Sequence, residues 1–264
     1  MSWKKVAALA VAALVALAPE AAAQSSAGVG DYQPGPGYIT SPAAPAVPRG
    51  PDPTDIYRDS EHWAHLEAPG GLMPGGRIVN ITKGSLCSVG FMVLKDGRRY
   101  VLTAGHCGNQ GDEFGYFRRD PNTGRESVIP FGRMVFSYQT ADYASVYGLI
   151  DAGNAPYLAS PFKQGKSGAP LAVSALPRYN PPVCRLGFRS GLSCGGFIGF
   201  EGRGVIRYYA IADHGDSGGP VYALINGKFH PVGMTSYGYT SRATQSFATP
   251  LAPIVQHFGL TVLY

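Results

Sequence analysis

The sequence is poor in charge and cysteine and contains no dense run of basic residues. Charged residues make up 15% of its 264 positions, and the net charge of +5 is spread along the chain. This pattern gives no indication of a nucleic-acid groove and suits an ordinary polar surface. The four cysteines show no CxxC spacing, so a zinc site is disfavoured. We expect no metal, no organic cofactor and no nucleic-acid partner.

The N-terminus has the composition of a secretory signal. Two lysines precede an apolar run at residues 6–18, and alanines at 21–23 form a small-residue cleavage site. The run is too short and too rich in alanine for a comfortable membrane span. We therefore expect residues 1–23 to be a signal peptide, the protein to be secreted, and no stable membrane insertion after cleavage. An uncleaved membrane anchor is the alternative.

The segment after the signal shows no pattern of a core of its own. Residues 24–56 are rich in proline, glycine, alanine and serine, which is typical of a flexible or extended stretch. Residues 57–76 contain few hydrophobic side chains and end in Pro-Gly-Gly, so we interpret residues 24–76 as a pro-segment or linker. His62 and His65 could bind a metal from one helix face. With no third ligand nearby, a solvated pair is favoured.

From residue 77 onward the chain has the composition and turn pattern of an all-β protein. The whole sequence contains 36 glycines and 22 prolines, which suits many short strands joined by turns. Strands are predicted at 88–94, 99–104, 128–138, 143–150, 205–211, 220–225 and 231–236. Asp-Gly at 96–97 and Asn-Gly at 226–227 are hairpin signals. Helical spacing occurs only at 250–258, with Gly259 as a stop, so we expect an all-β fold with a short C-terminal helix.

Two short motifs indicate nucleophilic catalysis. Residues 215–220 read Gly-Asp-Ser-Gly-Gly-Pro and place Ser217 among glycines, which permit tight turns and close backbone approach. A nucleophilic serine needs such a turn, because neighbouring backbone N–H groups can then hold the oxyanion that forms on an attacked carbonyl. Upstream, residues 103–107 read Thr-Ala-Gly-His-Cys and supply His106 as a base for the serine hydroxyl.

In this order the two motifs resemble those of the chymotrypsin-like serine proteases. The resemblance covers about residues 78–264. It implies a protease domain at 77–264 that consists of two packed antiparallel β-barrels, at about 77–157 and 158–264. No internal sequence repeat is visible, so the double barrel rests on the resemblance and not on periodicity.

The resemblance also assigns a role to each motif residue. Ser217 would attack the carbonyl, His106 would transfer protons, and the backbone N–H groups of Gly215 and Ser217 would form the oxyanion hole. If the order is His, Asp, Ser, the carboxylate that orients His106 lies between His106 and Ser217. Eight acidic residues qualify: Asp112, Glu113, Asp120, Glu126, Asp142, Asp151, Glu201 and Asp213.

Among these carboxylates we select Asp142. Most of the others lie among turn residues and charges, where a solvated role is expected. Asp142 opens a stretch of hydrophobic residues, and a carboxylate at the head of a buried strand needs a partner because an unpaired buried charge is costly. His106 would be that partner. The Asp-Tyr pair at 142–143 also resembles the bacterial secreted branch of the family, the streptogrisins and alpha-lytic-type proteases.

Export makes disulfides permissible, and the four cysteines allow three pairings. Locality favours Cys87–Cys107 and Cys184–Cys194. Each bridge would close a short loop and stabilise the fold by roughly 3 kcal/mol on the chain-entropy model.

Two partners compete for Asp216. In the bacterial branch an arginine follows the first cysteine of a short disulfide loop and pairs with the aspartate before the catalytic serine, which implies a pair between Arg185 and Asp216. Alternatively, residues 77–80 resemble an activation cleavage site whose freed terminus, at Ile78, would insert beside Asp216. Asn80 replaces the usual glycine there, and the stretch from Ile78 to the first cysteine reaches only about 30 Å fully extended. We therefore expect Arg185 and not Ile78.

The substrate pocket is indicated by similarity alone. Ser236, Tyr237 and Gly238 resemble the strand that pairs with the substrate backbone and walls the pocket. Ile211 stands where trypsin has its pocket aspartate, which argues for apolar or aromatic preference, and His214 lies at the pocket rim by analogy. A cysteine pair that flanks this pocket in many relatives is missing from the sequence.

Taken together, the sequence predicts a secreted, monomeric serine endopeptidase that acts on polypeptides through a Ser-His-Asp triad. Two alternatives remain. The first is a non-enzymatic binding module on a protease fold, which the presence of all three triad residues disfavours. The second is an esterase that uses the same triad, although residues 215–220 do not match the nucleophile elbow of the α/β-hydrolases.

Overall fold

A computed structural model of the chain describes residues 54–141, 146–202, 204–238 and 244–264. The expected signal peptide, residues 24–53 and Asp142 lie outside the described residues. Within the described part, no helix is long and apolar enough to cross a membrane.

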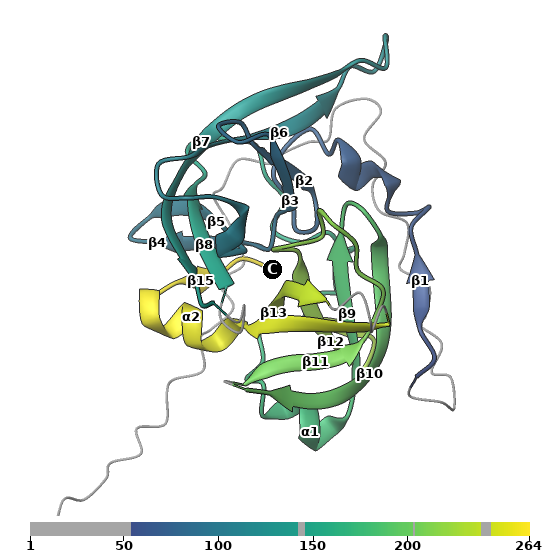
Figure 1. The fold of residues 1–264 in the computed structure, drawn as a ribbon. Coiled ribbons are helices and arrows are strands. Elements are labelled where there is room, and N and C mark those ends of the chain that lie inside the picture. The colour runs from purple at the N-terminus through teal and green to yellow at the C-terminus, as the bar shows by residue number, and fades with distance from the viewer. Residues whose placement is uncertain (1–53, 142–145, 203, 239–243) are drawn as a thin grey trace, which may run out of the picture. The chain divides into compact units, whose positions relative to one another are not determined.

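Six antiparallel strands form a closed barrel in the second half of the chain (Figure 1). The strands are β9 (Pro182–Gly187), β10 (Gly191–Glu201), β11 (Val205–Tyr209), β12 (Pro220–Ile225), β13 (Lys228–Gly238) and β14 (Gln245–Pro250). They pair in the order β10, β11, β14, β13, β12 and β9, and β9 pairs back onto β10 to close the barrel. Closure leaves no open edge in this ring of strands.

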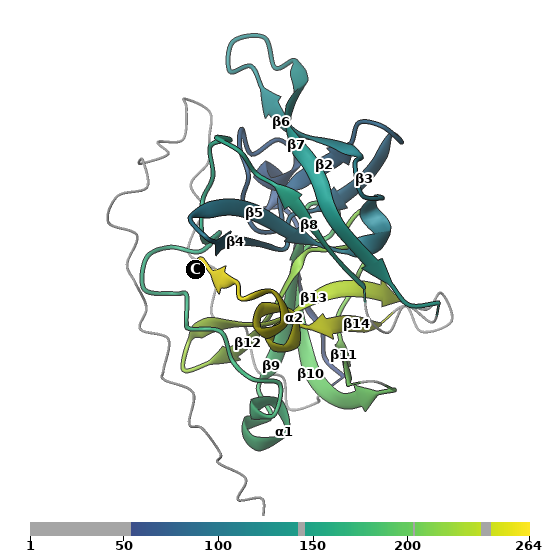
Figure 2. The same cartoon turned by 90° about the vertical axis from the view of Figure 1, so that its left-hand side faces the viewer.

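The first half of the chain forms a curled sheet of eight strands, a half-barrel. Its strands are β2 (Arg77–Asn80), β3 (Ser85–Ser88), β4 (Phe91–Lys95), β5 (Arg98–Thr103), β6 (Glu113–Arg119), β7 (Glu126–Gln139), β8 (Val146–Asp151) and β15 (Thr261–Val262). The order is β15, β4, β5, β8, β7, β6, β2 and β3. The long β6–β7 hairpin projects from this sheet (Figure 2).

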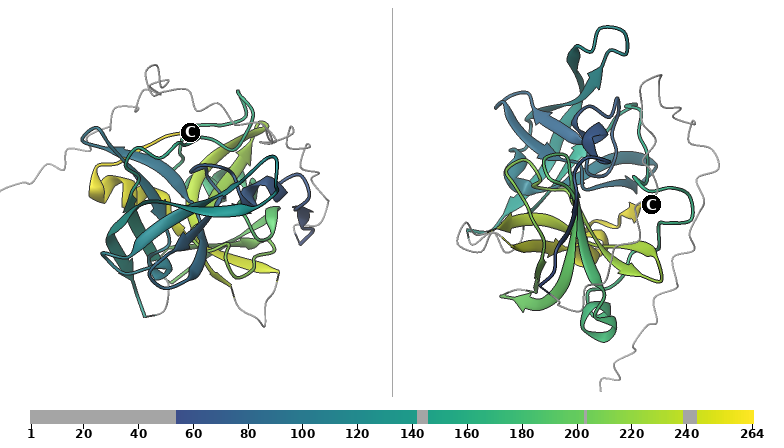
Figure 3. Two further views of the ribbon diagram at one scale, coloured as in Figure 1. Left: turned by 90° about the horizontal axis from the view of Figure 1, so that it is seen from above. Right: turned by 90° about the vertical axis from the view of Figure 1, so that its right-hand side faces the viewer.

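The two ends of the described chain cross over between the sheets. Strand β1 (Tyr57–Asp59) pairs with β10 of the closed barrel, and the right panel of Figure 3 shows it running alongside the green strands. At the other end, helix α2 (Leu251–Phe258) leads to β15, which pairs with β4 of the half-barrel. Each end of the described chain therefore pairs with the sheet that the opposite half of the chain forms.

The predicted fold class is confirmed, and so are the two hairpin signals. Asp-Gly at 96–97 joins β4 to β5 and Asn-Gly at 226–227 joins β12 to β13, and all four residues have positive φ. Helix α2 ends at Gly259 in the left-handed conformation, as the sequence predicts. A second short helix, α1 (Ala175–Tyr179), was not predicted, because its five residues are too few to show helical periodicity.

The largest cluster of buried side chains joins the two sheets. It contains Phe91 from β4, Tyr222 from β12 and Ile254 from α2. The rings of Phe91 and Tyr222 meet edge to face at 5.8 Å. The side chains of this shared core stay buried only while the two sheets are packed together, whereas each sheet also has a buried cluster of its own.

Residues 57–76 contribute Trp63, Leu66 and Met73 to this shared core, and Leu72 to the buried cluster of the half-barrel. Four of their side chains are at most 2% exposed: Trp63, Leu66, Leu72 and Met73. The segment hydrogen-bonds to both sheets through β1 and through Gly70, whose N–H donates to the Phe117 carbonyl of β6 at 3.0 Å. A simple linker would not bury such residues, so the structure corrects the linker interpretation for this part of the segment.

Leu66 provides a test of this packing. Because its side chain is fully buried, we expect Leu66→Ala to lower the free energy of unfolding by about 2–5 kcal/mol. Denaturant unfolding of the unprocessed chain measures this effect. Leu86→Ala, at a 41% exposed leucine, is the matched control and should change the value by about 0.5 kcal/mol or less. Equal effects of the two substitutions would contradict the packing described here.

Candidate active site

The Gly-Asp-Ser-Gly-Gly-Pro turn lies between β11 and β12 and presents Ser217 at a partly exposed position. Gly215 has a φ of 103°, and a Cβ atom there would lie 2.7 Å from the ring of Phe188. Both facts require glycine at this position. Within the part of the chain that the structure describes, no hydrogen-bond acceptor is recorded for the N–H of Gly215 or Ser217. The turn therefore offers two donors beside the serine hydroxyl.

Asp216, between these two donors, forms a buried ion pair with Arg185 of β9. The Nη1 and Oδ2 atoms lie 2.8 Å apart, and both side chains are 0% exposed. Arg185 also donates to the carbonyls of Ile211 at 2.7 Å and Gly191 at 3.3 Å. The partner that the bacterial resemblance implied for Asp216 is therefore the one that the structure places there.

The carboxylate of Asp216 accepts four further hydrogen bonds. The backbone N–H groups of Arg189, Ser190 and Asp213 donate at 3.1, 3.2 and 2.8 Å, and the Ser190 hydroxyl donates at 2.7 Å. A buried charge is tolerated when its lone pairs are satisfied in this way. Ser190 was not predicted from the sequence as part of the site. Its signal was weak, since it is one polar residue in the short β9–β10 turn.

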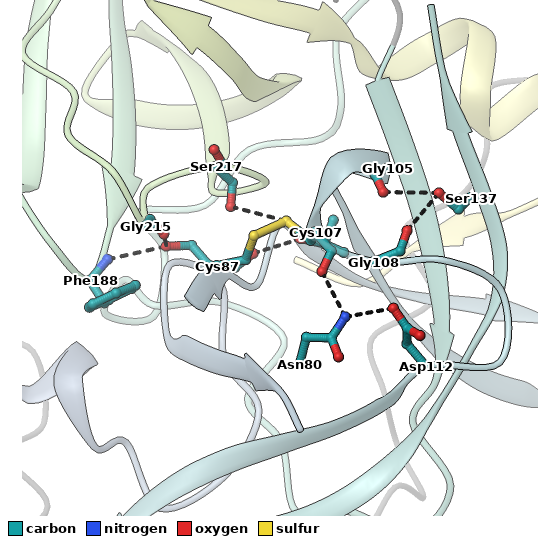
Figure 4. Close-up of a disulfide and its surroundings, with 12 residues drawn as sticks. Asn80, Cys87, Gly105, Cys107, Gly108, Asp112, Ser137, Phe188, Gly215 and Ser217 are labelled. Carbon is teal, nitrogen blue, oxygen red and sulfur yellow. Dashed lines mark hydrogen bonds between the residues drawn. A yellow bond between two sulfur atoms is a disulfide. The ribbon is translucent and has the colours of Figure 1, made fainter. Parts of the chain in front are cut away.

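His106 lies in the 3-10 turn η2 (Gly105–Cys107), directly after β5. The Ser137 hydroxyl lies 2.9 Å from the carbonyls of both Gly105 and Gly108 and so holds the two ends of the turn (Figure 4). Gly105 is required, because a Cβ atom would overlap the Tyr138 carbonyl. Burial lowers the pKa of His106 below its ordinary value of 6.5.

The disulfide Cys87–Cys107 joins β3 to the residue after His106, and Cys184–Cys194 joins β9 to β10. These are the pairings that locality favours. Cys107 Sγ lies 3.9 Å from the Ser217 carbonyl oxygen, so the histidine turn contacts the serine turn through this bridge (Figure 4). The two motifs, far apart in the sequence, are neighbours in the fold.

Asn80 and Asp112 form a buried polar cluster under the histidine turn. Asn80 Nδ2 donates to the Cys107 carbonyl at 3.1 Å and to Asp112 Oδ2 at 2.8 Å (Figure 4). Asp112 also accepts from the Asn109 N–H at 2.8 Å and pairs with Lys83 at 3.1 Å. A solvated role was expected for most of the candidate carboxylates other than Asp142, a group that includes Asp112. That expectation is wrong for Asp112, because the loop after Cys107 folds the carboxylate inward onto Asn80.

Residues 77–80, which resemble an activation cleavage site, form strand β2 of the half-barrel. Ile78 is fully buried within β2, which pairs with β3 and β6. Arg77 forms ion pairs with Glu67 and Glu126 and lies over the Phe117 ring. Since Arg185 occupies the place beside Asp216, Ile78 has no role there.

The five predicted pocket residues differ in their surroundings. Ser236 is buried, Tyr237 is half-buried and Gly238 is exposed at the end of β13. The ring of Tyr237 stacks on Phe247 at 4.6 Å. Ile211, whose carbonyl accepts from Arg185, is half-buried, and His214 is exposed.

His62 and His65 each have a partner within their own segment. Nδ1 of His62 lies 3.0 Å from Asp59 Oδ2, and Nδ1 of His65 lies 3.2 Å from the His62 carbonyl. Among the described residues, no group of three or more side chains is arranged to hold a metal ion.

Comparisons with solved structures identify the architecture. Thermobifida fusca protease A is 23% identical, with a TM-score of 0.53 over 73% of this chain and 98% of that one. Cellulomonas bogoriensis chymotrypsin is 24% identical, with a TM-score of 0.52 over 72% of this chain and 97% of that one. At these identities the comparison shows the fold alone. The class is therefore the two-barrel fold of the chymotrypsin type.

Comparisons of sequence lead to the family. No family model matches the chain. Streptogrisin-C of Streptomyces griseus is 30% identical over 203 residues, which cover 72% of this chain and 40% of that protein. Streptogrisin-A of the same organism is 28% identical over 206 residues, which cover 73% and 61%. The match thus spans about half the length of these relatives. Together with the fold and the two motifs, these relatives support placing the chain with the bacterial chymotrypsin-like serine proteases.

The buried ion pair leads to a stability prediction. Arg185→Met leaves Asp216 buried without its cation, so we expect the free energy of unfolding to fall by about 3–5 kcal/mol. Denaturant unfolding measures the loss. Arg189→Met is the matched control, because that arginine is 58% exposed and lies 3.9 Å from Asp213. A loss no larger than that of the control would show that the pair does not hold the turn.

Asp112 leads to a prediction of pH dependence. Hydrogen bonds from Asn109 and Asn80 lower the pKa of Asp112 below its ordinary value of 3.8. Its stabilising effect is therefore complete above that value and is lost as the pH falls through the lower folded pKa. We expect Asp112→Asn to lose less thermal stability than wild type between about pH 6 and about pH 2.5. The exposed Asp96→Asn variant should keep the wild-type slope, and an unchanged slope in Asp112→Asn would disprove the role.

Proposed function

We propose that this chain is a secreted serine endopeptidase that cleaves polypeptides through an acyl-enzyme. The observation that carries the proposal is the contact between the two motif turns. Ser217 lies on a turn with two available N–H donors, and the residue after His106 contacts the Ser217 backbone. In this mechanism Ser217 attacks the carbonyl and the N–H groups of Gly215 and Ser217 hold the oxyanion.

His106 acts as the general base and then as the general acid. Because burial lowers the pKa of His106, its imidazole is neutral at neutral pH and can accept the Ser217 proton. The resulting imidazolium then donates this proton to the leaving amine. A water molecule, activated in the same way, hydrolyses the acyl-enzyme.

Asp142 orients His106 in this proposal. It lies outside the described residues, four positions before the start of β8 at Val146. Two observations support the choice. Val146 is fully buried, and its N–H donates to Thr249 Oγ1 at 3.2 Å, so β8 starts at the junction between the two sheets. A carboxylate four positions before this strand is close enough along the chain to reach the histidine turn.

Substrate preference is proposed as apolar or aromatic. Ile211 supplies no charge at the position where a pocket aspartate would select lysine or arginine. Ser236, Tyr237 and Gly238 would pair with the substrate backbone as an added antiparallel strand. We further propose that residues 1–23 direct export, that residues 77–264 form the protease domain, and that the enzyme acts as a monomer without a cofactor.

A fluorophosphonate probe tests the proposed nucleophile. We expect the probe to label the wild-type protein at Ser217, and we expect Ser217→Ala to abolish both labelling and peptide hydrolysis. Ser127→Ala, at an exposed serine of β7, is the matched control and should behave as wild type. Folded wild-type protein without labelling would disprove catalysis and favour a binding module. Hydrolysis of esters without hydrolysis of peptides would favour the esterase.

Peptide hydrolysis by Asp142→Asn tests the proposed orienting carboxylate. We expect kcat to fall by about 10⁴, as it does when a triad aspartate is lost. A carboxylate beside an imidazolium raises the histidine pKa, so its removal leaves burial alone to lower that pKa. The acid limb of the kcat/KM profile should therefore move to lower pH. Unchanged activity would assign the orienting role to another residue.

A further inference from the structure

Ser88, the last residue of β3, lies beside the turn that carries Ser217, and its side chain is 0% exposed. It follows Cys87, whose disulfide holds the residue after His106. Neither sequence motif includes Ser88. We propose that Ser88 is a positioning residue for the oxyanion hole, because its hydroxyl fixes the peptide that follows Gly215.

Four hydrogen bonds use every polar atom of Ser88. Its N–H donates to the Ser217 carbonyl at 2.9 Å, and its hydroxyl donates to the Gly215 carbonyl at 3.0 Å. The hydroxyl also accepts from the Phe188 N–H at 3.3 Å, and the Ser88 carbonyl accepts from Thr103 Oγ1 at 2.9 Å. A residue of the half-barrel thus holds the carbonyls on both sides of the buried aspartate in the other barrel. Figure 4 shows Gly215, Ser217 and Phe188 on one side of the Cys87–Cys107 disulfide, with Ser137 and Asp112 on the other.

The hydroxyl of Ser88 fixes the peptide plane between Gly215 and Asp216. The carbonyl of this plane accepts from Ser88, and its N–H, that of Asp216, donates to the Asp213 carbonyl at 3.0 Å. A plane bonded at both edges cannot rotate without breaking both bonds. Gly215 lacks a Cβ and has a φ of 103°, so the loss of one bond gives this peptide rotational freedom that other residues would not have.

The plane after Ser217 depends on Ser88 in a different way. Its carbonyl accepts from the Ser88 backbone N–H, and its own N–H, that of Gly218, donates to the Thr235 carbonyl at 2.8 Å. Any residue except proline at position 88 supplies this backbone donor. A change of the Ser88 side chain therefore acts on the Gly215 plane and leaves the Ser217 plane bonded.

The Ser88 hydroxyl also links the turn that contains Gly215 to the segment that begins at Phe188. Phe188, whose N–H it accepts, packs its ring against Gly215 and begins the turn that donates to Asp216. Without the hydroxyl, the Phe188 N–H and the Gly215 carbonyl lose their hydrogen-bond partner. Each group then gains free energy if its peptide rotates to find another partner. The peptide between Gly215 and Asp216 carries neither oxyanion donor but joins the two peptides that do, so its rotation displaces the N–H groups of Gly215 and Ser217. Because the oxyanion needs both donors at about 2.7–3.1 Å, the displacement weakens stabilisation of the transition state more than it weakens substrate binding.

The experiment compares Ser88→Ala with wild type and with Ser160→Ala. Among the described residues, the hydroxyl of Ser160 bonds only to Phe162 and Ser167 of its own segment, so this variant controls for the loss of a serine hydroxyl. The substrate is a chromogenic peptide with an aromatic residue before the scissile bond. For Ser88→Ala we expect kcat to fall about 10-fold and KM to stay within about twofold, a smaller loss than removal of an oxyanion donor itself.

Two further readouts separate positioning from a merely structural effect. A peptide aldehyde adds to the serine and places an oxyanion in the hole, so its affinity should fall about 10-fold in Ser88→Ala. A peptide acid of the same sequence measures ground-state binding, and its affinity should not change. The melting temperature shows whether each variant is folded during the assay.

Each outcome of these measurements supports or overturns the proposed role of Ser88. Unchanged kcat and aldehyde affinity in folded Ser88→Ala would overturn the proposal. If Ser88→Ala does not fold, Ser88→Thr, which keeps the hydroxyl, decides: kcat within about threefold of wild type supports the proposal and a 10-fold loss overturns it. The inference rests on the proposed function, and the two fail differently. Inactive, unlabelled wild type removes both, whereas active wild type with an unaffected Ser88→Ala removes only the role of Ser88.

Discussion

Arg185 and Asp216 carry opposite charges in a place without solvent, and the nucleophile turn is built around them. Burial of two ions has a large desolvation penalty, which close contact and additional hydrogen bonds must offset. Here the carboxylate receives five donors, one of them from the arginine. The donors come from β9, from the β9–β10 turn and from Asp213, which lies just before the Gly-Asp-Ser turn. Because all of them converge on one side chain, these separate segments keep a single arrangement around Ser217.

This arrangement has a counterpart in the half-barrel. The turn that carries His106 is bonded from three sides, by Ser137, by Asn80 and by the disulfide to β3. Each of these contacts lies within the same sheet. The two turns are therefore supported separately, and the catalytic geometry depends on how the sheets meet. Ser88 and the shared apolar core make that junction, which explains why a polar residue is fully buried there.

The sequence predicted much of this structure where local chemistry decides. The hairpins at 96–97 and 226–227 were recognisable because Asp-Gly and Asn-Gly adopt positive φ easily. Strands β9 and β10 were not predicted as strands. Strand β9 begins at a proline and carries an arginine, and β10 contains two adjacent glycines, features that are unfavourable in isolated strands. They form strands because both lie in the closed barrel with neighbours on each side.

By itself the sequence determined the class of fold, the two motifs and the chemistry that a serine, a histidine and a glycine-rich turn can perform. These follow from residue types at neighbouring positions, whose geometry the local backbone sets. Only the tertiary structure decided that Asp112 lies inward, that residues 57–76 belong to the core and that Ser88 contacts the nucleophile turn. Each of these depends on contacts between residues far apart in the chain. Such contacts leave no periodic signal, because they form only when the two sheets pack together.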